Sequence, residues 1–212
     1  MAAFLGVLLS VQGNGFDGAD QAMMAFVHGL RSDGLTPVAT FLSWFGDAMM
    51  NIVLAVVALA VLYMVFKQRS ELVLFVAAVG GSVILNTVLK HIIMRARPLE
   101  SAIAMEDGFA FPSGHSMAAV ALYGTLTYLL WKHVPARAGR VLMLLVSLLM
   151  IEGIGWSRVY LGVHYPSDVI GGYLMSAAWL LAVIGIYETY RKRKHPAGIP
   201  QFKEAANERI KA

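Results

Sequence analysis

The chain alternates long apolar stretches with short polar ones along most of its length. The apolar stretches cover approximately residues 40–66, 71–93, 114–134, 139–157 and 167–188. A helix that crosses a bilayer needs about 20 mostly apolar residues, and each stretch is close to or above that length. The first is interrupted by Gly46 and Asp47, so we expect its membrane-embedded part to begin near Ala48. The pattern predicts an all-α integral membrane protein built as a helical bundle.

The two ends of the chain depart from this pattern. Residues 1–11 are apolar but too short to span a bilayer, and they lack the charged region of a secretory signal. We therefore expect a first span that is short or truncated, which gives about six transmembrane helices in one domain over residues 1–194. Residues 195–212 are polar, with a proline and a glycine near their start, which predicts a loosely ordered cytoplasmic tail.

Composition supports the membrane assignment. Of the 212 residues, 58% are hydrophobic and only 14% are charged, whereas soluble domains carry about 25% charged residues. The chain has no cysteine, which excludes disulfides and thiolate metal sites. The formal charge of +4 arises largely from the basic cluster 191–194, which favours contact with membrane lipids that carry anionic head groups. Nothing else favours nucleic acid as a partner, and the sequence leaves the oligomeric state open.

Basic residues are unevenly distributed between the two ends of the predicted spans. They follow the second span, join the fourth to the fifth and follow the last, at Lys67, Arg69, Lys132, Arg137, Arg140 and 191–194. Because cytoplasmic loops carry an excess of lysine and arginine, these places and the C-terminus are predicted to be cytoplasmic. The opposite, outer side then holds residues 12–39, 95–112 and 158–166.

One stretch on this outer side has a helical apolar pattern of its own. Asp17 and Asp20 are expected to open a short helix over residues 17–32. The apolar residues expected to gather roughly on one of its faces are Ala19, Met23, Phe26, Val27 and Leu30. Such a helix either lies in the head-group layer beside a lipid entrance or simply connects two spans.

Three short motifs lie at the outer ends of the predicted spans. They are Lys90-x6-Arg97-Pro98, Pro112-Ser113-Gly114-His115 and Ser157-Arg158-x5-His164-x3-Asp168. Together they supply three fixed cations, a turn rich in backbone N–H groups and two histidines, one of which has a carboxylate four residues downstream. Metal-free phosphoryl transfer needs such groups, because the enzyme must neutralise a phosphate and supply both a nucleophile and an acid.

The third motif places a histidine just before a helix. Proline favours the first turn of a helix, so Pro166 puts Asp168 inside that turn. The carboxylate can then accept a proton from one ring nitrogen of His164 and leave the other free to attack phosphorus. The alternative, for such a pair in isolation, is a histidine at a helix end with Asp168 serving only the helix dipole.

The second motif is typical of a turn that opens a helix. A helix N-terminus presents unpaired N–H groups to an anion, and glycine allows a close backbone approach. Ser113 and Gly114 are therefore candidate phosphate-binding residues. His115 is a candidate proton donor to the leaving group.

The three cations of the first and third motifs are candidates to clamp the phosphoryl oxygens. Arg97 and Arg158 suit two parallel hydrogen bonds to a phosphate. Lys90, near the end of its span, is the third. In the alternative interpretation, its side chain extends along the helix so that its charge reaches water.

Taken together, the order and spacing of the motifs resemble those of the type-2 phosphatidic acid phosphatase family, membrane lipid phosphate phosphatases that share a site design with vanadium haloperoxidases. The match runs from Lys90 to Asp168, and the layout is similar to bacterial phosphatidylglycerophosphatase B and undecaprenyl-pyrophosphate phosphatase members. The resemblance implies a multi-pass enzyme of the bacterial plasma membrane that hydrolyses the terminal phosphate of a lipid phosphate or pyrophosphate. It implies a phosphohistidine on His164, His115 as acid and then base, and neither a cofactor nor a metal.

Several residues beside the motifs have open interpretations. Arg95 serves either catalysis or the surface and lipid head groups. Glu152, a carboxylate inside a predicted span, either contacts an arginine or a head group or packs in its protonated form. Pro98 and Ser157 are candidate supports of the site. The remaining side chains that we expect to be structural or solvated are His28, His91, His133 and His195. Asn86, one turn before Lys90, either faces the same site or makes a hydrogen bond in helix packing. Helix packing is expected at the small residues 80–82 and 171–172.

Two other functions remain to be weighed against a lipid phosphatase. A vanadium-dependent haloperoxidase is disfavoured by the spans, and a non-catalytic lipid-binding or lipid-flipping protein is disfavoured by the complete motif set. Among lipid phosphates, the motifs do not distinguish phosphatidylglycerophosphate, undecaprenyl pyrophosphate and phosphatidate, because all three present the same terminal group.

Overall fold

The computed structural model describes residues 2–64, 69–98 and 102–194, and all regular structure within them is helical. The elements are α1 (Ala2–Gln12), α2 (Asp17–Gly29), α3 (Leu35–Gly46), α4 (Ala48–Met64), α5 (Arg69–Ile93), α6 (Gly114–Leu130), the 3-10 turn η2 (Trp131–His133), α7 (Arg137–Tyr160) and α8 (Pro166–Lys194). The predicted tail over 195–212 lies outside the described residues.

Three of the described helices, α5, α7 and α8, are long and apolar enough to cross a membrane. The pair α3 and α4, which is bent by 56° at its break, makes a fourth if the two helices form one broken span. The apolar run predicted over 40–66 is thus two helices, and the second begins at Ala48 as expected. Asp47 ends the first helix and caps the second, because its Oδ1 accepts a hydrogen bond of 2.9 Å from Met49 N. The 17-residue α6 and the short α1 complete the bundle.

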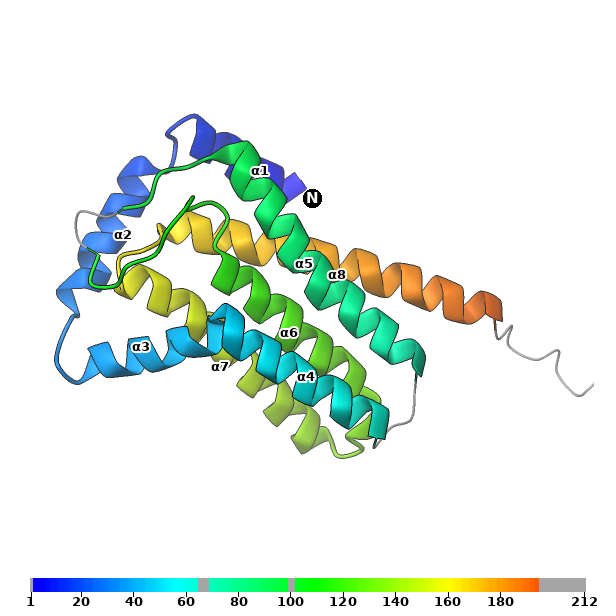
Figure 1. Cartoon of the computed structure of the whole chain (residues 1–212). Helices are drawn as coiled ribbons and strands as arrows, with labels where there is room; N and C mark the ends of the chain where they lie inside the picture. The colour runs from blue at the N-terminus through cyan, green and yellow to red at the C-terminus, as the bar shows by residue number, and fades with distance from the viewer. Residues whose placement is uncertain (1, 65–68, 99–101, 195–212) are drawn as a thin grey trace, which may run out of the picture.

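Helix α6 lies at the centre of the bundle and packs against α5, α7 and α8 (Figure 1). Small residues make this close packing possible. A Cβ added at Gly172 of α8 would lie 2.9 Å from the backbone oxygen of Ser113, and one at Gly81 of α5 would lie 2.3 Å from the ring of Trp179. The small-residue contacts predicted at these two places are confirmed: Gly172 brings α8 against the start of α6, and Gly81 brings α5 against α8. Gly80 differs, because nothing lies within 4 Å of an added Cβ there.

Helices α1 and α2 cover one end of the bundle (Figure 1). The prediction for α2 was wrong in one respect, because Val27 does not share a face with Met23 and Phe26. Met23 and Phe26 are 51% and 65% exposed, whereas Met24 and Val27 are buried against α7 and α8. With 3.6 residues per turn, positions 20, 24 and 27 form the inner face.

The two ends of the bundle carry different chemistry. The described parts of the segment 94–113 and the turn 161–165 lie beside α2 at one end, and these hold or flank the three motifs (Figure 1). The opposite end holds η2, the start of α7 and the end of α8, with basic residues that include Arg137, Arg140 and Arg191. The separation of the motifs from the basic clusters agrees with the expectation from the sequence.

Candidate active site

His164 lies in the turn between α7 and α8 and is completely buried. Helix α8 begins at Pro166, which places Asp168 in its first turn as expected. Nδ1 of His164 lies 3.4 Å from Oδ2 of Asp168, within ion-pair range but without a well-aligned hydrogen bond. Nε2 of the same ring faces the other way and lies 3.1 Å from Nη1 of Arg97. The ring therefore stands between a carboxylate and a cationic pocket.

The surroundings of His164 favour its neutral form. Burial, followed by the charges of Arg158, Arg97 and Lys90, lowers the pKa of His164 well below the usual value of 6.5. Arg97 is a donor without acceptor capacity. A neutral ring that accepts from it at Nε2 carries its proton at Nδ1, toward Asp168. This arrangement directs the Nε2 lone pair toward Arg97 on the pocket side of the ring.

Arg97 is held rigidly by the backbone around it. Its Nε donates to Gly108 O at 3.0 Å, its Nη2 to Asp107 O at 3.1 Å and its Nη1 to Val163 O at 2.9 Å. Arg158, in the last turn of α7, is buried and donates to Ser43 Oγ. An arginine that is already oriented loses less rotamer freedom when it binds an anion.

A residue that the sequence did not single out, Glu106, occupies the centre of this pocket. Its Oε1 lies 3.3 Å from Arg97 Nη2, 3.9 Å from His164 Nε2 and 4.0 Å from His115 Nδ1, and its Oε2 pairs with Arg158 Nη2. One carboxylate thus reaches four of the predicted site residues. The four side chains therefore surround one carboxylate, which is itself an oxyanion.

The second motif contributes the edge of this space. Ser113 caps α6: its Oγ accepts from Ser116 N at 3.4 Å and from Ser116 Oγ at 3.0 Å, while its N–H donates to Asp168 O at 3.0 Å. Its polar groups therefore hold α6 and α8 together, and its role as a phosphate ligand stays a prediction. Gly114 and His115 begin α6 behind it. Lys90 lies in the last turn of α5, close enough to interact electrostatically with Arg97 and Arg158.

A second ion cluster lies on the other side of Asp168. Arg95 donates from Nη1 to Asp168 Oδ1 at 2.5 Å and from Nη2 to Asp20 Oδ2 at 2.9 Å. Its guanidinium also lies 4.3 Å from the centroid of the Tyr165 ring. Although burial opposes it, the carboxylates of Asp168 and Asp20 raise the pKa of Arg95. The interpretation of Arg95 as a surface or head-group residue is therefore wrong, because its charge is bound to two buried acids.

Comparison with known proteins agrees with this geometry. The sequence profile described as the PAP2 superfamily matches residues 71–192, more than half of the chain. The chain belongs to the PAP2 superfamily. The resemblance drawn from the three motifs is thereby confirmed.

The PAP2 relatives include enzymes named for different lipids. A phosphatidylglycerophosphatase B of Bacillus subtilis (strain 168) is 30% identical over 89% of this chain and 93% of its own length. An undecaprenyl-diphosphatase of Sulfolobus acidocaldarius is 26% identical over 56% of each chain. The crystal structure of a transmembrane PAP2-type phosphatidylglycerolphosphate phosphatase from Bacillus subtilis superposes with a TM-score of 0.83 at 31% identity, over 89% of this chain and 94% of that one. This likeness confirms the all-α membrane fold.

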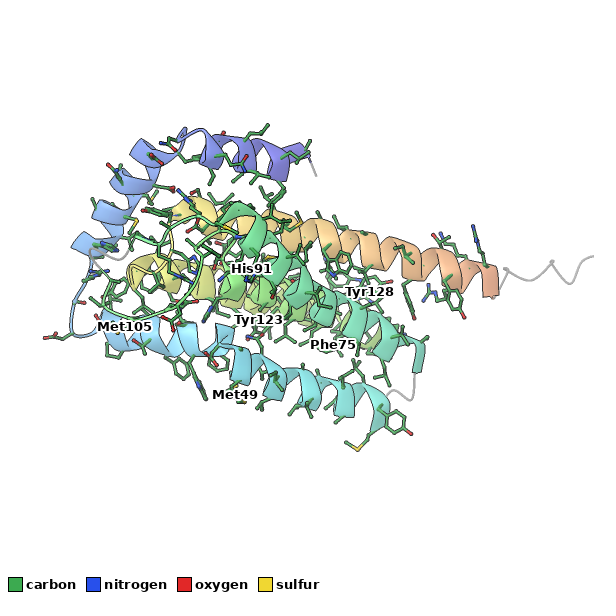
Figure 2. All side chains as sticks on the ribbon, turned by 45° about the horizontal axis from the view of Figure 1, so that its top comes forward. Met49, Phe75, His91, Met105, Tyr123 and Tyr128 are labelled. Atoms are coloured by element: carbon green, nitrogen blue, oxygen red, sulfur yellow. The ribbon has the colours of Figure 1, made fainter. Side chains whose placement is uncertain are left out.

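A cavity of about 1040 Å³ extends from the PAP2 site into the bundle. Glu106, His115 and Arg158 line its polar end. The remainder runs between α4 and α5 and is lined by apolar side chains that include Ile52, Leu59, Val76, Val79 and Val83. Figure 2 shows Phe75, another lining residue, in the space between these two helices, and Met105 on the loop beside α3. The charged pocket and the apolar groove are one continuous space.

Of the other residues considered from the sequence, Asn86 borders this cavity, whereas Glu152, Pro98 and Ser157 do not. Glu152 is exposed on α7, and no contact with an arginine occurs among the described residues. Pro98 is buried, and Ser157 Oγ donates to Ile154 O within its own helix at 2.6 Å. Asn86 Nδ2 donates to Pro112 O at 3.0 Å, in keeping with the expected packing role. Asp20 and Glu106 were missed as site residues, since the sequence indicated Asp20 only as a residue that opens a short helix and gave no indication for Glu106.

Proposed function

We propose that this PAP2 enzyme hydrolyses the terminal phosphate of a lipid phosphate or diphosphate through a phosphohistidine, without a metal ion. The observation that carries this proposal is the position of Glu106, whose carboxylate pairs with both arginines of the motifs and lies within 4.0 Å of both histidines. Groups that converge on one oxyanion can converge on another, and a phosphoryl group is the oxyanion that a histidine nucleophile can attack.

In the first step, Nε2 of His164 forms a bond to phosphorus while the bond from phosphorus to the lipid oxygen breaks. His115 donates a proton to the departing oxygen. Asp168 accepts a hydrogen bond from Nδ1–H of His164 and so stabilises the positive charge that the ring acquires. In the second step, water attacks phosphorus with His115 as the base, the phosphorus–nitrogen bond breaks and orthophosphate leaves.

Lys90, Arg97 and Arg158 stabilise the charge that builds on the equatorial oxygens in both steps. The N–H groups at the start of α6 add to this. Glu106 must leave the pocket before a phosphate enters, because both are anions that need the same two arginines.

The groove between α4 and α5 favours a lipid as the substrate. Its apolar walls suit an acyl or prenyl chain whose phosphate lies against Arg158 and His115. The names of the relatives point to a phosphatidylglycerophosphate or a polyprenyl diphosphate, and phosphatidate has the same terminal group. A panel of these lipids, presented in detergent and in bilayers with phosphate release as the readout, separates them.

A phosphate-release assay on matched variants tests the mechanism. His164→Ala removes the atom that bonds phosphorus, so turnover should vanish for every substrate. His115→Ala removes the proton donor and should slow a lipid substrate by about 10²–10⁴-fold. The phosphorylation step on p-nitrophenyl phosphate should be spared, because its leaving group departs unprotonated. Equal losses in that step on both substrates would contradict the division of roles, and loss of activity with EDTA that Mg²⁺ restores would contradict the metal-free mechanism.

We also propose that the site faces the extracytoplasmic side of a bacterial plasma membrane, with the C-terminus inside. Because the chain has no cysteine, single-cysteine variants report sidedness directly. Asp33→Cys lies exposed at the site end and Ala136→Cys lies exposed at the opposite end. A membrane-impermeant maleimide on intact cells should label the first and not the second, and the reverse pattern would place the site in the cytoplasm.

A further inference from the structure

Asp20 is a buried acid on the inner face of α2. Its relative exposure is 2%, whereas Asp17, three residues earlier in the same first turn of α2, is exposed. The motifs and the catalytic steps make no use of Asp20. A buried carboxylate is strongly unfavourable unless it is paired and hydrogen-bonded, so its contacts are the guide to its role.

Two of those contacts tie α2 to the beginning of α8. Oδ1 of Asp20 accepts from Ser167 N at 2.9 Å, and Oδ2 accepts from Ser167 Oγ at 2.5 Å. The first N–H groups of a helix have no partner within the helix, and a carboxylate there also interacts favourably with the helix dipole. Asp20 therefore serves as a cap for α8 from a different helix. The residue after Ser167 is Asp168.

The third contact joins Asp20 to the catalytic carboxylate through an arginine. Nη2 of Arg95 binds Asp20 while Nη1 binds Asp168 Oδ1 and Ser167 Oγ, the latter at 2.7 Å. One cation is thus shared between two carboxylates, and the cluster keeps a net negative charge. With Oδ1 of Asp168 engaged, Oδ2 is left to face His164 and to accept from Tyr165 N at 2.9 Å.

We propose that Asp20 is a positioning residue of this active site: through Arg95 and Ser167 it fixes the orientation of Asp168 and shares the charge of Arg95. Without Asp20, the full charge of Arg95 would act on Asp168 alone. Asp168 would then be a poorer acceptor for Nδ1–H of His164, and the ring a weaker nucleophile. This role rests on the proposed function, in which His164 attacks phosphorus.

Other charged groups also face His164, so the effect of Asp20 must be separated from theirs. They come from α5, α6, α7, α8 and the segment 94–113, and they are Lys90, His115, Arg158, Asp168, Arg97 and Glu106. Among the residues that the structure describes, Asp20 is linked to this group through Arg95 and Ser167. A variant that changes Asp20 alone leaves the anion pocket unaltered.

The decisive variant is Asp20→Asn, which keeps the shape of the side chain and removes its charge. Misplacement of a catalytic group by about 1 Å can reduce the rate about 10²-fold, so we expect a decrease of about that size in kcat with little change in KM. Asp17→Asn is the matched control, since it removes the same charge from the same turn of α2 at an exposed position. Asp20→Glu, which retains the charge, should recover part of the loss.

Two further measurements distinguish positioning from a loss of fold. In the Arg95→Gln background, adding Asp20→Asn should cause little additional loss of kcat, because each change interrupts the same contacts from Asp20 through Arg95 to Asp168. NMR titration of ¹⁵N-histidine-labelled protein in detergent, with His164 assigned by His164→Gln, should give a lower His164 pKa in Asp20→Asn than in the wild type. That titration requires no turnover, so it tests the link to Asp20 even if the lipid assay shows that the proposed function is wrong.

The positioning role is excluded if Asp20→Asn reduces the yield or thermal stability of the protein while kcat per folded molecule and the His164 titration match those of Asp17→Asn. Additive losses in Asp20→Asn and Arg95→Gln would exclude a path through Arg95. Wild-type phosphate release together with loss of turnover in His164→Ala would show in the same assay that the proposed function itself stands.

Discussion

Two arginine clusters lie on opposite sides of His164, and they differ in what neutralises them. Arg95 is bound to two acids, Asp20 and Asp168, which belong to packed helices. Arg97 and Arg158 share one acid, Glu106, which belongs to the segment between α5 and α6 and is 23% exposed. The first cluster has more negative than positive charge and the second has more positive. Only the second cluster has positive charge available for a substrate, so similar arginines have different tasks.

The largest expected effect comes from replacing an arginine of the second cluster. Arg158→Gln removes a donor to the transition-state oxygens, and loss of one such donor typically costs about 10²–10³-fold in kcat. Thermal stability should change little, because Glu106 keeps its contact with Arg97. Arg95→Gln should lower kcat as Asp20→Asn does, because Asp168 loses its partner, but it should also lower stability strongly, since it leaves two buried carboxylates close together without their cation. Breaking a buried pair typically destabilises a fold by about 3–5 kcal/mol. Melting curves and phosphate release on both variants decide whether the clusters differ as stated.

Removing the acid of the second cluster should strengthen anion binding. A site that is free for only about a tenth of the time binds its ligand about tenfold more weakly than the free site does. We therefore expect Glu106→Gln to bind orthophosphate about tenfold more tightly, measured as inhibition of p-nitrophenyl phosphate hydrolysis. Asp107→Asn removes the same charge one residue later, at an exposed position, and should have a smaller effect. Weaker phosphate binding in Glu106→Gln would mean that Glu106 assists the ligand instead of competing with it.

The pH dependence of the free energy of unfolding reports on the protonation of His164, whose ring lies between the two arginine clusters. His164 has a lowered pKa in the folded protein, so below pH 6.5 the unfolded chain binds a proton there that the folded chain does not. Stability should therefore fall as the pH is lowered from 6.5, with this one site contributing up to about 1.4 kcal/mol per pH unit. His164→Gln should reduce that slope, which unfolding measured between pH 7.5 and 5.5 in detergent can detect. An unchanged slope would indicate that His164 titrates normally in the fold.

The smallest effect is expected from a carboxylate that belongs to neither cluster. Glu152 is exposed on α7, and exposed substitutions usually have little effect. Glu152→Gln should keep kcat and KM on several lipids within about twofold of the wild type. A larger change on one lipid alone would assign Glu152 a contact with that head group.

Much of the fold could be predicted from the sequence because the bilayer requires long apolar helices. The spans, the helix start at Ala48 and the close packing at Gly172 depend on local composition. The exposed and buried faces of α2 could not be assigned in the same way. The apolar residues of α2 face both outward and inward, and only contact with α7 and α8 determines that Val27 is buried while Phe26 is exposed.

Some residues of the candidate site could likewise be predicted from the sequence, and others could not. The motif spacings brought His164, Asp168, Arg97 and Arg158 together, since each lies in or next to a helix end whose position follows from the spans. Glu106 lies in a segment with no periodic pattern, so nothing local indicates that its side chain points inward.

The groove between α4 and α5 bears on which substrate concentration sets the reaction rate, the concentration in water or the concentration within the membrane. A substrate whose tail lies in such a groove can arrive by diffusing within the membrane plane, without first dissolving in water. Its supply is then set by its mole fraction among the surrounding lipids, and adding inert phospholipid at a fixed total amount of substrate should dilute it. The rate then depends on the surface concentration of the substrate, and other lipids of the membrane lower that rate by diluting the substrate.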